Sequence, residues 1–168
     1  PAPKYLSNFI HDKELRSLLD QFSKLEIMSN LKTEATLRQE ALSGIRGYSK
    51  SDLNHITSKI PDASFTLRLG NKFYRVALEL ELHHKSNKRL QAKMEHYVAK
   101  SRFDFVIYVA GQESVFNALM RNYKYIISNS SRIKFADKKS PIYDWAFFIS
   151  DDFLTFLYGA QFGGLICH

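Results

Sequence analysis

The segment at residues 63–82, ASFTLRLGNKFYRVALELEL, constrains the fold more than any other part of the chain. It holds two runs in which apolar and polar side chains alternate, and Gly70-Asn71 separates the two runs. Alternation with a period of two is typical of β-strands, and a glycine-asparagine pair between two such runs indicates a tight turn. The segment therefore predicts a β-hairpin.

The segments on either side of this hairpin carry helical or strand-like patterns. Near the N-terminus, apolar residues recur at three- and four-residue steps, which predicts a helix with one apolar face. That face comprises Leu6, Phe9, Ile10, Leu15, Leu18, Leu19 and Phe22. A second, shorter helix is predicted over residues 31–42, with Thr33 as a candidate N-cap. Residues 47–62 are polar and turn-rich, and predict a loop or a short helix before the sheet.

After the hairpin, residues 87–101 and 112–127 have helical spacing, whereas 103–111 and 145–150 are apolar runs suited to buried strands. The predicted order of elements is α-α-β-β-α-β-α-β. A hairpin followed by crossover helices implies an α/β fold, in which helices flank a mixed β-sheet.

The length and charge of the chain limit its organisation and its partners. With 168 residues, of which 45% are hydrophobic, we expect a single domain spanning residues 1–168. The chain begins with Pro1 rather than Met, so the interpretation that it is a piece of a longer chain with additional domains stays open. The 24 Lys and Arg against 17 Asp and Glu give a net charge of +7, which favours a polyanionic partner, nucleic acid first.

One cysteine, Cys167, excludes an internal disulfide and a cysteine-rich zinc site, which fits a reducing interior. The sequence holds no apolar run of the roughly 18 residues that a membrane span requires, and no signal peptide pattern. We therefore expect a cytoplasmic protein without a membrane partner.

Three carboxylates are the candidate metal ligands. In a strand, alternate side chains share a face, so Glu79 and Glu81 point to the same side while Leu78 and Leu80 point to the other. Asp62 opens the preceding strand, and its carboxylate could meet either glutamate. Hard oxygen ligands of this kind suit Mg²⁺ or Mn²⁺. Spacing alone leaves two interpretations open, a divalent-metal site and an acidic strand face exposed to solvent.

The order of several motifs resembles the PD-(D/E)XK nuclease superfamily. Glu34 and Arg38 lie on an early predicted helix, then come IPDASF and ALELELHHKS, and Lys93 and Tyr97 follow on the next predicted helix. In that superfamily, a helical glutamate precedes a hairpin that carries the motif acids, and a helix and a third strand follow. The resemblance covers roughly residues 30 to 110. More narrowly, TEATLR, IPDASF, LELE and RLQAKMEHY resemble the replication-relaxation proteins of bacterial plasmids.

The resemblance implies a role for each matching residue. Asp62 matches the motif aspartate, Glu79 the second acid, and Glu34 the glutamate that supports the site. Glu81 stands where the family usually has a lysine, which implies a further metal ligand or a base that activates water. The missing ammonium is expected from Lys93 or, as the alternative, from Lys85. Arg38 and Tyr97 are expected to support the site.

Basic residues are the candidate DNA contacts. Arg89, Lys93 and Tyr97 form a polar stripe along one predicted helix, and the stripe could face the cleft. The second half of the chain is also locally basic, through Arg121, Lys124, Arg132, Lys134, Lys138 and Lys139. These residues are either a surface that contacts the phosphate backbone or an ordinary solvated helix and loop.

The histidines carry weaker signals. His83 lies next to the acids and could touch a phosphate. The adjacent His84 points to the opposite face of the strand, so the two histidines cannot easily chelate one ion. His11-Asp12 and His96 are expected to be surface or packing residues.

The resemblance implies a metal-dependent DNA endonuclease or nickase, acting in plasmid or mobile-element replication. Two alternatives stay open: a catalytically silent nuclease fold that binds DNA or docks a protein, which the absent E-x-K lysine favours, and a scaffold that binds no nucleic acid. Many nucleases of this fold act as dimers, so a homodimer also stays open.

Overall fold

The structure is a computed structural model, and it describes residues 4–43, 49, 57, 59–100, 102–129 and 145–149. The elements follow in the order α1 (Lys4–Phe22), β1 (Met28–Thr33), α2 (Glu34–Leu42), β2 (Ala63–Leu69), β3 (Lys72–Glu81), α4 (Asn87–Lys100), β4 (Phe105–Ala110), α5 (Glu113–Asn129) and β5 (Trp145–Ile149). Most of the predicted loop at 47–62 lies outside the described residues, as do Arg132, Lys134, Lys138, Lys139 and Cys167.

The five strands form one mixed sheet in the order β1-β2-β3-β4-β5. β1 and β2 are antiparallel, as are β2 and β3, whereas β3, β4 and β5 run parallel to one another. The predicted hairpin is confirmed: Gly70-Asn71 joins β2 to β3, and Gly70 has a φ of +59°, which glycine adopts at no steric cost. The predicted class, an α/β fold with helices flanking a mixed sheet, is confirmed.

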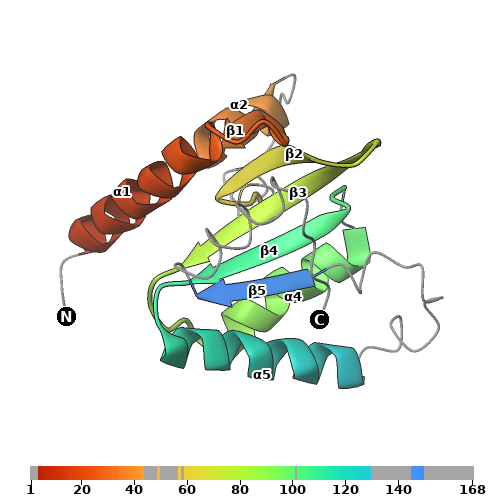
Figure 1. The fold of residues 1–168 in the computed structure, drawn as a ribbon. Coiled ribbons are helices and arrows are strands. Elements are labelled where there is room, and N and C mark those ends of the chain that lie inside the picture. The colour runs from red at the N-terminus through yellow and green to blue at the C-terminus, as the bar shows by residue number, and fades with distance from the viewer. Residues whose placement is uncertain are drawn as a thin grey trace.

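Helices cover both faces of this sheet (Figure 1). On one face, Leu18 and Phe22 of α1 pack in a cluster with Leu78 of β3. On the other face, Met94 of α4 and Leu119 of α5 pack in a second cluster with strand residues of β3 and β4. β3 lies at the centre of the sheet, so its two faces contact two different helical layers.

One strand was not predicted. β1 is an edge strand at Met28–Thr33, so the prediction of a helix from residue 31 is wrong for its first three residues. Four of the six side chains of β1 are exposed, and a strand with one free edge needs no apolar alternation. α2 begins after Thr33, whose side chain accepts a hydrogen bond from the backbone of Thr36, as the N-cap prediction requires.

The apolar face of α1 is buried in the C-terminal half of the helix. Leu15, Leu18, Leu19 and Phe22 are in the core, whereas Phe9 and Ile10, which the spacing assigns to the same apolar face, are exposed. The N-terminal part of α1 extends past the sheet and has no strand beneath it (Figure 1). In the described part of the chain, no helix is both long enough and apolar enough to cross a membrane.

Candidate functional site

Glu79 and Glu81 are buried in the middle of the protein, with 0% and 1% of their surface exposed. They lie at the C-terminal end of β3, on the face that α4 covers, where Ala77 of the same strand joins the core. The interpretation of these residues as an acidic face exposed to solvent is therefore wrong. Burying a carboxylate is costly unless a cation or hydrogen-bond donors accompany it, so the partners of these two acids decide what they do.

Glu79 has a partner on each carboxyl oxygen, and both partners come from α4. The ammonium of Lys93 donates to Oε2, and the phenol of Tyr97 donates to Oε1. Residues four apart lie on the same side of a helix, and α4 is held against the sheet by Leu90 and Met94, so both donors face β3. The structure thus brings Lys93, rather than a lysine of β3, to the second predicted acid.

These contacts shift the protonation of all three side chains. Burial raises the pKa of Glu79 to about 8, although the charge of Lys93 acts in the opposite direction. Burial alone would lower the pKa of Lys93, but the charges of Glu79 and Asp62 outweigh it and leave that pKa raised. Burial and the charge of Glu79 raise the pKa of Tyr97 well above 10, so its phenol stays protonated as a donor.

Glu81 is paired with Lys85, which follows β3 in the chain. The ammonium of Lys85 lies 2.7 Å from Oε1 and 2.6 Å from Oε2 of Glu81. The two lysines considered for the site thus contact different acids. Lys93 contacts the carboxyl group of Glu79, and Lys85 contacts that of Glu81. Two separate ion pairs therefore lie beside each other at the end of β3.

Asp62 lies directly before β2, at the same end of the hairpin. The register pairs Ala63 with Leu78, and continuing it by one residue places Asp62 beside Glu79. The backbone N–H of Leu80 donates to Oδ2 of Asp62 at 2.7 Å. Burial would raise the pKa of Asp62, but the hydrogen bond from His11 and the positive charge of Lys93 outweigh it and leave the pKa lowered.

His11 of α1 joins the site, although the sequence predicted a surface or packing residue. Its Nε2 lies 3.5 Å from Oδ2 of Asp62 and 3.1 Å from the carbonyl oxygen of Leu80, and its Nδ1 lies 3.5 Å from Oδ1 of Asp12. The hydrogen bond to Asp62 raises the pKa of His11 from 6.5 to about 9, against the opposing effect of burial. His11 is therefore an imidazolium at neutral pH.

The supporting residues Glu34 and Arg38 lie at the rim of the site. They form an ion pair one turn apart on α2, with both side chains exposed. The backbone N–H of Glu34 donates to the carbonyl oxygen of Asp62 at 2.9 Å, which ties the start of α2 to the start of β2. Both side chains line a cavity of about 580 Å³, whose other walls include His11, Asp62, Glu81, His83, Lys85 and Arg89.

The three predicted metal ligands do not converge on one point. Among the described residues, no group of three or more His, Cys, Asp or Glu side chains could hold a metal ion. Each acid instead contacts a cation of its own. A smaller set of oxygens is better placed. Oδ2 of Asp62 and the carbonyl oxygen of Leu80 both face the cationic Nε2 of His11, and they are the hard donors that Mg²⁺ or Mn²⁺ prefers. In donor type, this pair fits a divalent cation.

The predicted DNA contacts are spread over the surface. Arg89 lines the cavity described above, whereas Arg121 and Lys124 are exposed on α5 and line neither of the two cavities found beside β3. His83 lines the cavity of Glu34 and Asp62, and His84 contacts the hydroxyl of Ser114 at 3.1 Å. The two adjacent histidines therefore have different surroundings.

Comparisons with known proteins give no family for this chain. No protein-family model matches the sequence, and no curated protein matches it. Among solved structures, the chain is similar to the pre-specific restriction endonuclease BsaWI in its complex with DNA, with a TM-score of 0.37 and 14% sequence identity. That match covers 96% of this chain and 69% of the other chain.

Proposed function

We propose that the protein is a metal-dependent endodeoxyribonuclease of the PD-(D/E)XK type. The observation that carries the proposal is the position of Lys93, which reaches from α4 to the buried Glu79, while Asp62 lies beside Glu79 across the hairpin. An aspartate, a second acid and a lysine are the elements that such a site requires. They come together here although the sequence has Glu81 at the usual place of the lysine.

Each residue of the site has a distinct task in this proposal. Asp62, ionised because its pKa is lowered, would hold a divalent cation together with the carbonyl oxygen of Leu80, and Glu79 would assist once it has lost its proton. Such an ion supplies a water of lowered pKa and stabilises charge that develops on the scissile phosphate. Lys93 carries a positive charge beside Glu79 and would steady the phosphate.

A second candidate function, a catalytically silent nuclease fold that binds DNA, is favoured by the ion pairs themselves. Glu81 is neutralised by Lys85, and Glu79, which Lys93 contacts, stays largely protonated at pH 7 because its pKa is about 8. A cation would therefore have to compete with protons and ammonium groups that already satisfy these acids. DNA binding without hydrolysis is the outcome that this arrangement would produce if the competition fails.

The test is the conversion of supercoiled plasmid to nicked or linear DNA in Mg²⁺ or Mn²⁺. We expect cleavage by the unsubstituted protein, and loss of cleavage in Asp62→Asn, Glu79→Gln and Lys93→Met. The matched control is Glu26→Gln, which changes an exposed acid between α1 and β1. If the Asp62 and Glu79 variants are folded and cleave at the parental rate, the proposed site is wrong. DNA binding without cleavage by the parental protein would select the silent fold.

The finer part of the proposal is the biological substrate. The resemblance to replication-relaxation proteins suggests a nickase in plasmid or mobile-element replication. Such an activity predicts that nicked circles accumulate before linear DNA in the plasmid assay. If linear DNA appears without a nicked intermediate, this finer assignment is wrong, whereas the endonuclease proposal stands.

A further inference from the structure

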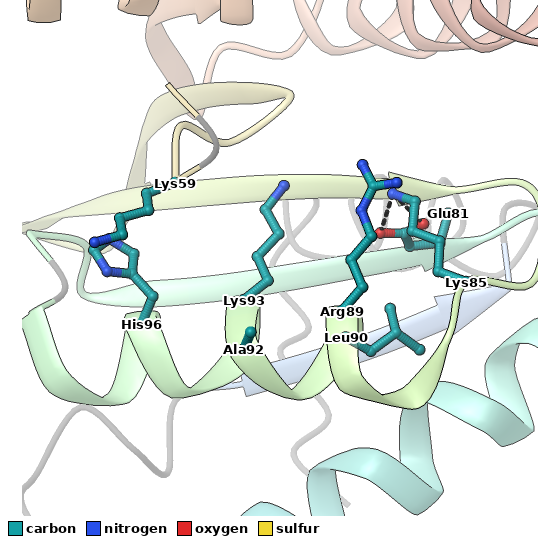
Figure 2. A pocket seen from close by; sticks show the side chains of 8 residues that line it. All are labelled: Lys59, Glu81, Lys85, Arg89, Leu90, Ala92, Lys93 and His96. Carbon is teal, nitrogen blue, oxygen red and sulfur yellow. Dashed lines mark hydrogen bonds and ion pairs between the residues drawn. The ribbon is translucent and has the colours of Figure 1, made fainter. Parts of the chain in front are cut away.

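A second cavity, of about 430 Å³, lies on the α4 side of β3 and is dominated by basic side chains. Its polar lining consists of Lys59, Glu81, Lys85, Arg89, Lys93 and His96. Figure 2 shows Arg89, Lys93 and His96 pointing from successive turns of α4 toward the same side, with Lys59 reaching in from the segment before β2. Residues from three parts of the chain thus contribute positive charge to one pocket.

Two of the cations that line this pocket are held by buried acids, Lys85 by Glu81 and Lys93 by Glu79. Lys59 and Arg89 add two further basic side chains to the described lining. The guanidinium of Arg89 forms no ion pair with any residue in the part of the chain that the structure describes. Positive charges held close together repel, so an anion in the pocket would be stabilised.

The pocket adjoins the proposed catalytic cavity. Glu81, Lys85 and Arg89 line both cavities, so these three side chains form the wall between them. Asp62 and His11 line only the first cavity, and Lys59, Lys93 and His96 line only the second. An extended polyanion that reaches the first cavity therefore has a basic cavity directly beside it.

We infer that the 430 Å³ pocket binds a phosphate and its sugar from the nucleotide adjacent to the scissile one in a DNA strand. This inference rests on the proposed function, since it takes the substrate to be a phosphodiester chain. Repeated phosphates are the feature that lets one ligand fill two adjoining cavities, and lysine and arginine are the side chains that contact them. The apolar surfaces of Leu90 and Ala92 provide the lining that a sugar ring contacts. Lys59 and Arg89 are the phosphate-binding residues.

The first experiment measures the affinity of a labelled DNA oligonucleotide in chelator, so that neither metal nor cleavage enters the result. We expect Lys59→Ala and Arg89→Ala each to weaken binding about tenfold. The charge-matched control is Lys72→Ala, because Lys72 is exposed at the opposite end of β3 from Glu81. The control should weaken binding by less than about twofold. Equal losses in all three variants, or no binding by the unsubstituted protein, would overturn the inference.

A second experiment locates the phosphate and separates it from a free anion. We expect a series of oligonucleotides, each with one neutral methylphosphonate at a different position, to reveal one important linkage. Neutralising that linkage should weaken DNA binding by the parental protein but not by the Lys59 and Arg89 variants. If no linkage behaves in this way, the strand assignment is wrong. It is also wrong if inorganic phosphate stabilises the parental protein more than Lys59→Ala against heat while both bind DNA equally well.

The outcomes separate this inference from the proposed function. If the protein cleaves DNA in Mg²⁺ but Lys59 and Arg89 behave like Lys72, the pocket assignment fails and the nuclease proposal survives. If no metal supports cleavage but Lys59 and Arg89 are selectively required for binding, the nuclease proposal fails and the pocket assignment survives.

Discussion

Tyr97 donates its phenolic hydrogen to Oε1 of Glu79, a carboxyl group that has no exposed surface. The contact joins α4 to the central strand of the sheet at the point where Lys93 takes the other oxygen of the same carboxyl. Since both oxygens are satisfied by one helix, the position of α4 and the protonation of Glu79 depend on each other. The first two predictions follow from this relationship.

Tyr97→Phe removes the hydroxyl and keeps the ring, and it should lower the free energy of unfolding by about 1–3 kcal/mol. The reason is that Oε1 of Glu79 stays buried and loses the donor that satisfies it. Urea denaturation at pH 7 measures the change. Tyr125→Phe, which alters an exposed tyrosine of α5, is the control and should have almost no effect. Similar losses in the two variants would show that the hydrogen bond to Glu79 does not contribute to stability.

Lys93→Met should destabilise the protein more at pH 9 than at pH 5. Without the ammonium, the pKa of Glu79 rises further above its present value of about 8, because Lys93 is the charge that lowers it. A raised carboxyl pKa gives stability that is present below the unfolded value of 4.5 and is lost as pH rises through the folded value. Because the folded pKa of Glu79 is about 8 with Lys93 present, the extra loss at pH 9 relative to pH 5 should be about 1.4 kcal/mol, which corresponds to one pH unit above that pKa.

Urea denaturation of this variant at the two pH values is the measurement, and a second substitution provides the control. Glu79→Gln removes the charge that Lys93 neutralises, so the double variant should recover much of the stability at pH 9. A loss that is the same at both pH values, with no recovery in the double variant, would contradict the role of this ion pair.

The charge of His11 should make the free energy of unfolding fall as the pH rises from 6.5 to about 9. Its folded pKa of about 9 lies above the ordinary value of 6.5, so its contribution is fully present below pH 6.5 and is lost as pH rises toward 9. The stability difference between the parental protein and His11→Gln should therefore shrink by about 2 kcal/mol over this interval, because solvent screening of this half-buried side chain reduces the roughly 3.4 kcal/mol that the full shift would give. Thermal unfolding across the pH range measures it, with His83→Gln as the control. A pH-independent difference would show that folding does not raise the pKa of His11.

The hairpin and the helices around it could be predicted because their signals are local. The alternation around Gly70-Asn71 and the helical spacing of residues 87–101 depend on neighbours within a few positions. β1 could not be predicted in this way, since an edge strand with mostly exposed side chains has no alternating pattern to detect. Its backbone also departs from regular pairing, with a register shift between Ser29 and Lys32 and a positive φ at Asn30.

In the candidate site too, contacts between neighbouring elements could be predicted and contacts between distant parts of the chain could not. The pairing of Glu79 with Lys93 joins two neighbouring elements, and a resemblance that gave their order was enough to suggest it. The contact of His11 with Leu80 joins residues 69 positions apart, and nothing in the spacing of His11 indicated it. The burial of Glu81 was also hidden, because an alternating strand has the same pattern whether its second face meets water or a helix.

His11→Ala should strengthen the binding of Mn²⁺ about tenfold, a gain of about 1.4 kcal/mol. The imidazolium lies against Oδ2 of Asp62 and the carbonyl oxygen of Leu80, the two oxygens expected to face the cation, so it competes for that place. Calorimetric titration with Mn²⁺ measures the affinity without any need for activity, and Asp62→Asn should abolish binding in either background. Weaker binding by His11→Ala would instead identify His11 as a ligand.

Replacing both Arg121 and Lys124 of α5 by Ala should lower the salt dependence of DNA binding. Each phosphate contact releases condensed counterions, so removing two contacts should reduce the slope of log affinity against log salt by about 2. Both side chains are exposed and lie outside the two cavities, so cleavage at saturating DNA should be unaffected. Gel retardation over a series of salt concentrations gives the slope. The double variant Lys13→Ala and Lys24→Ala removes the same charge from exposed positions at α1 and its end, and an equal fall in slope there would mean that net charge alone, rather than contact through α5, determines the salt dependence.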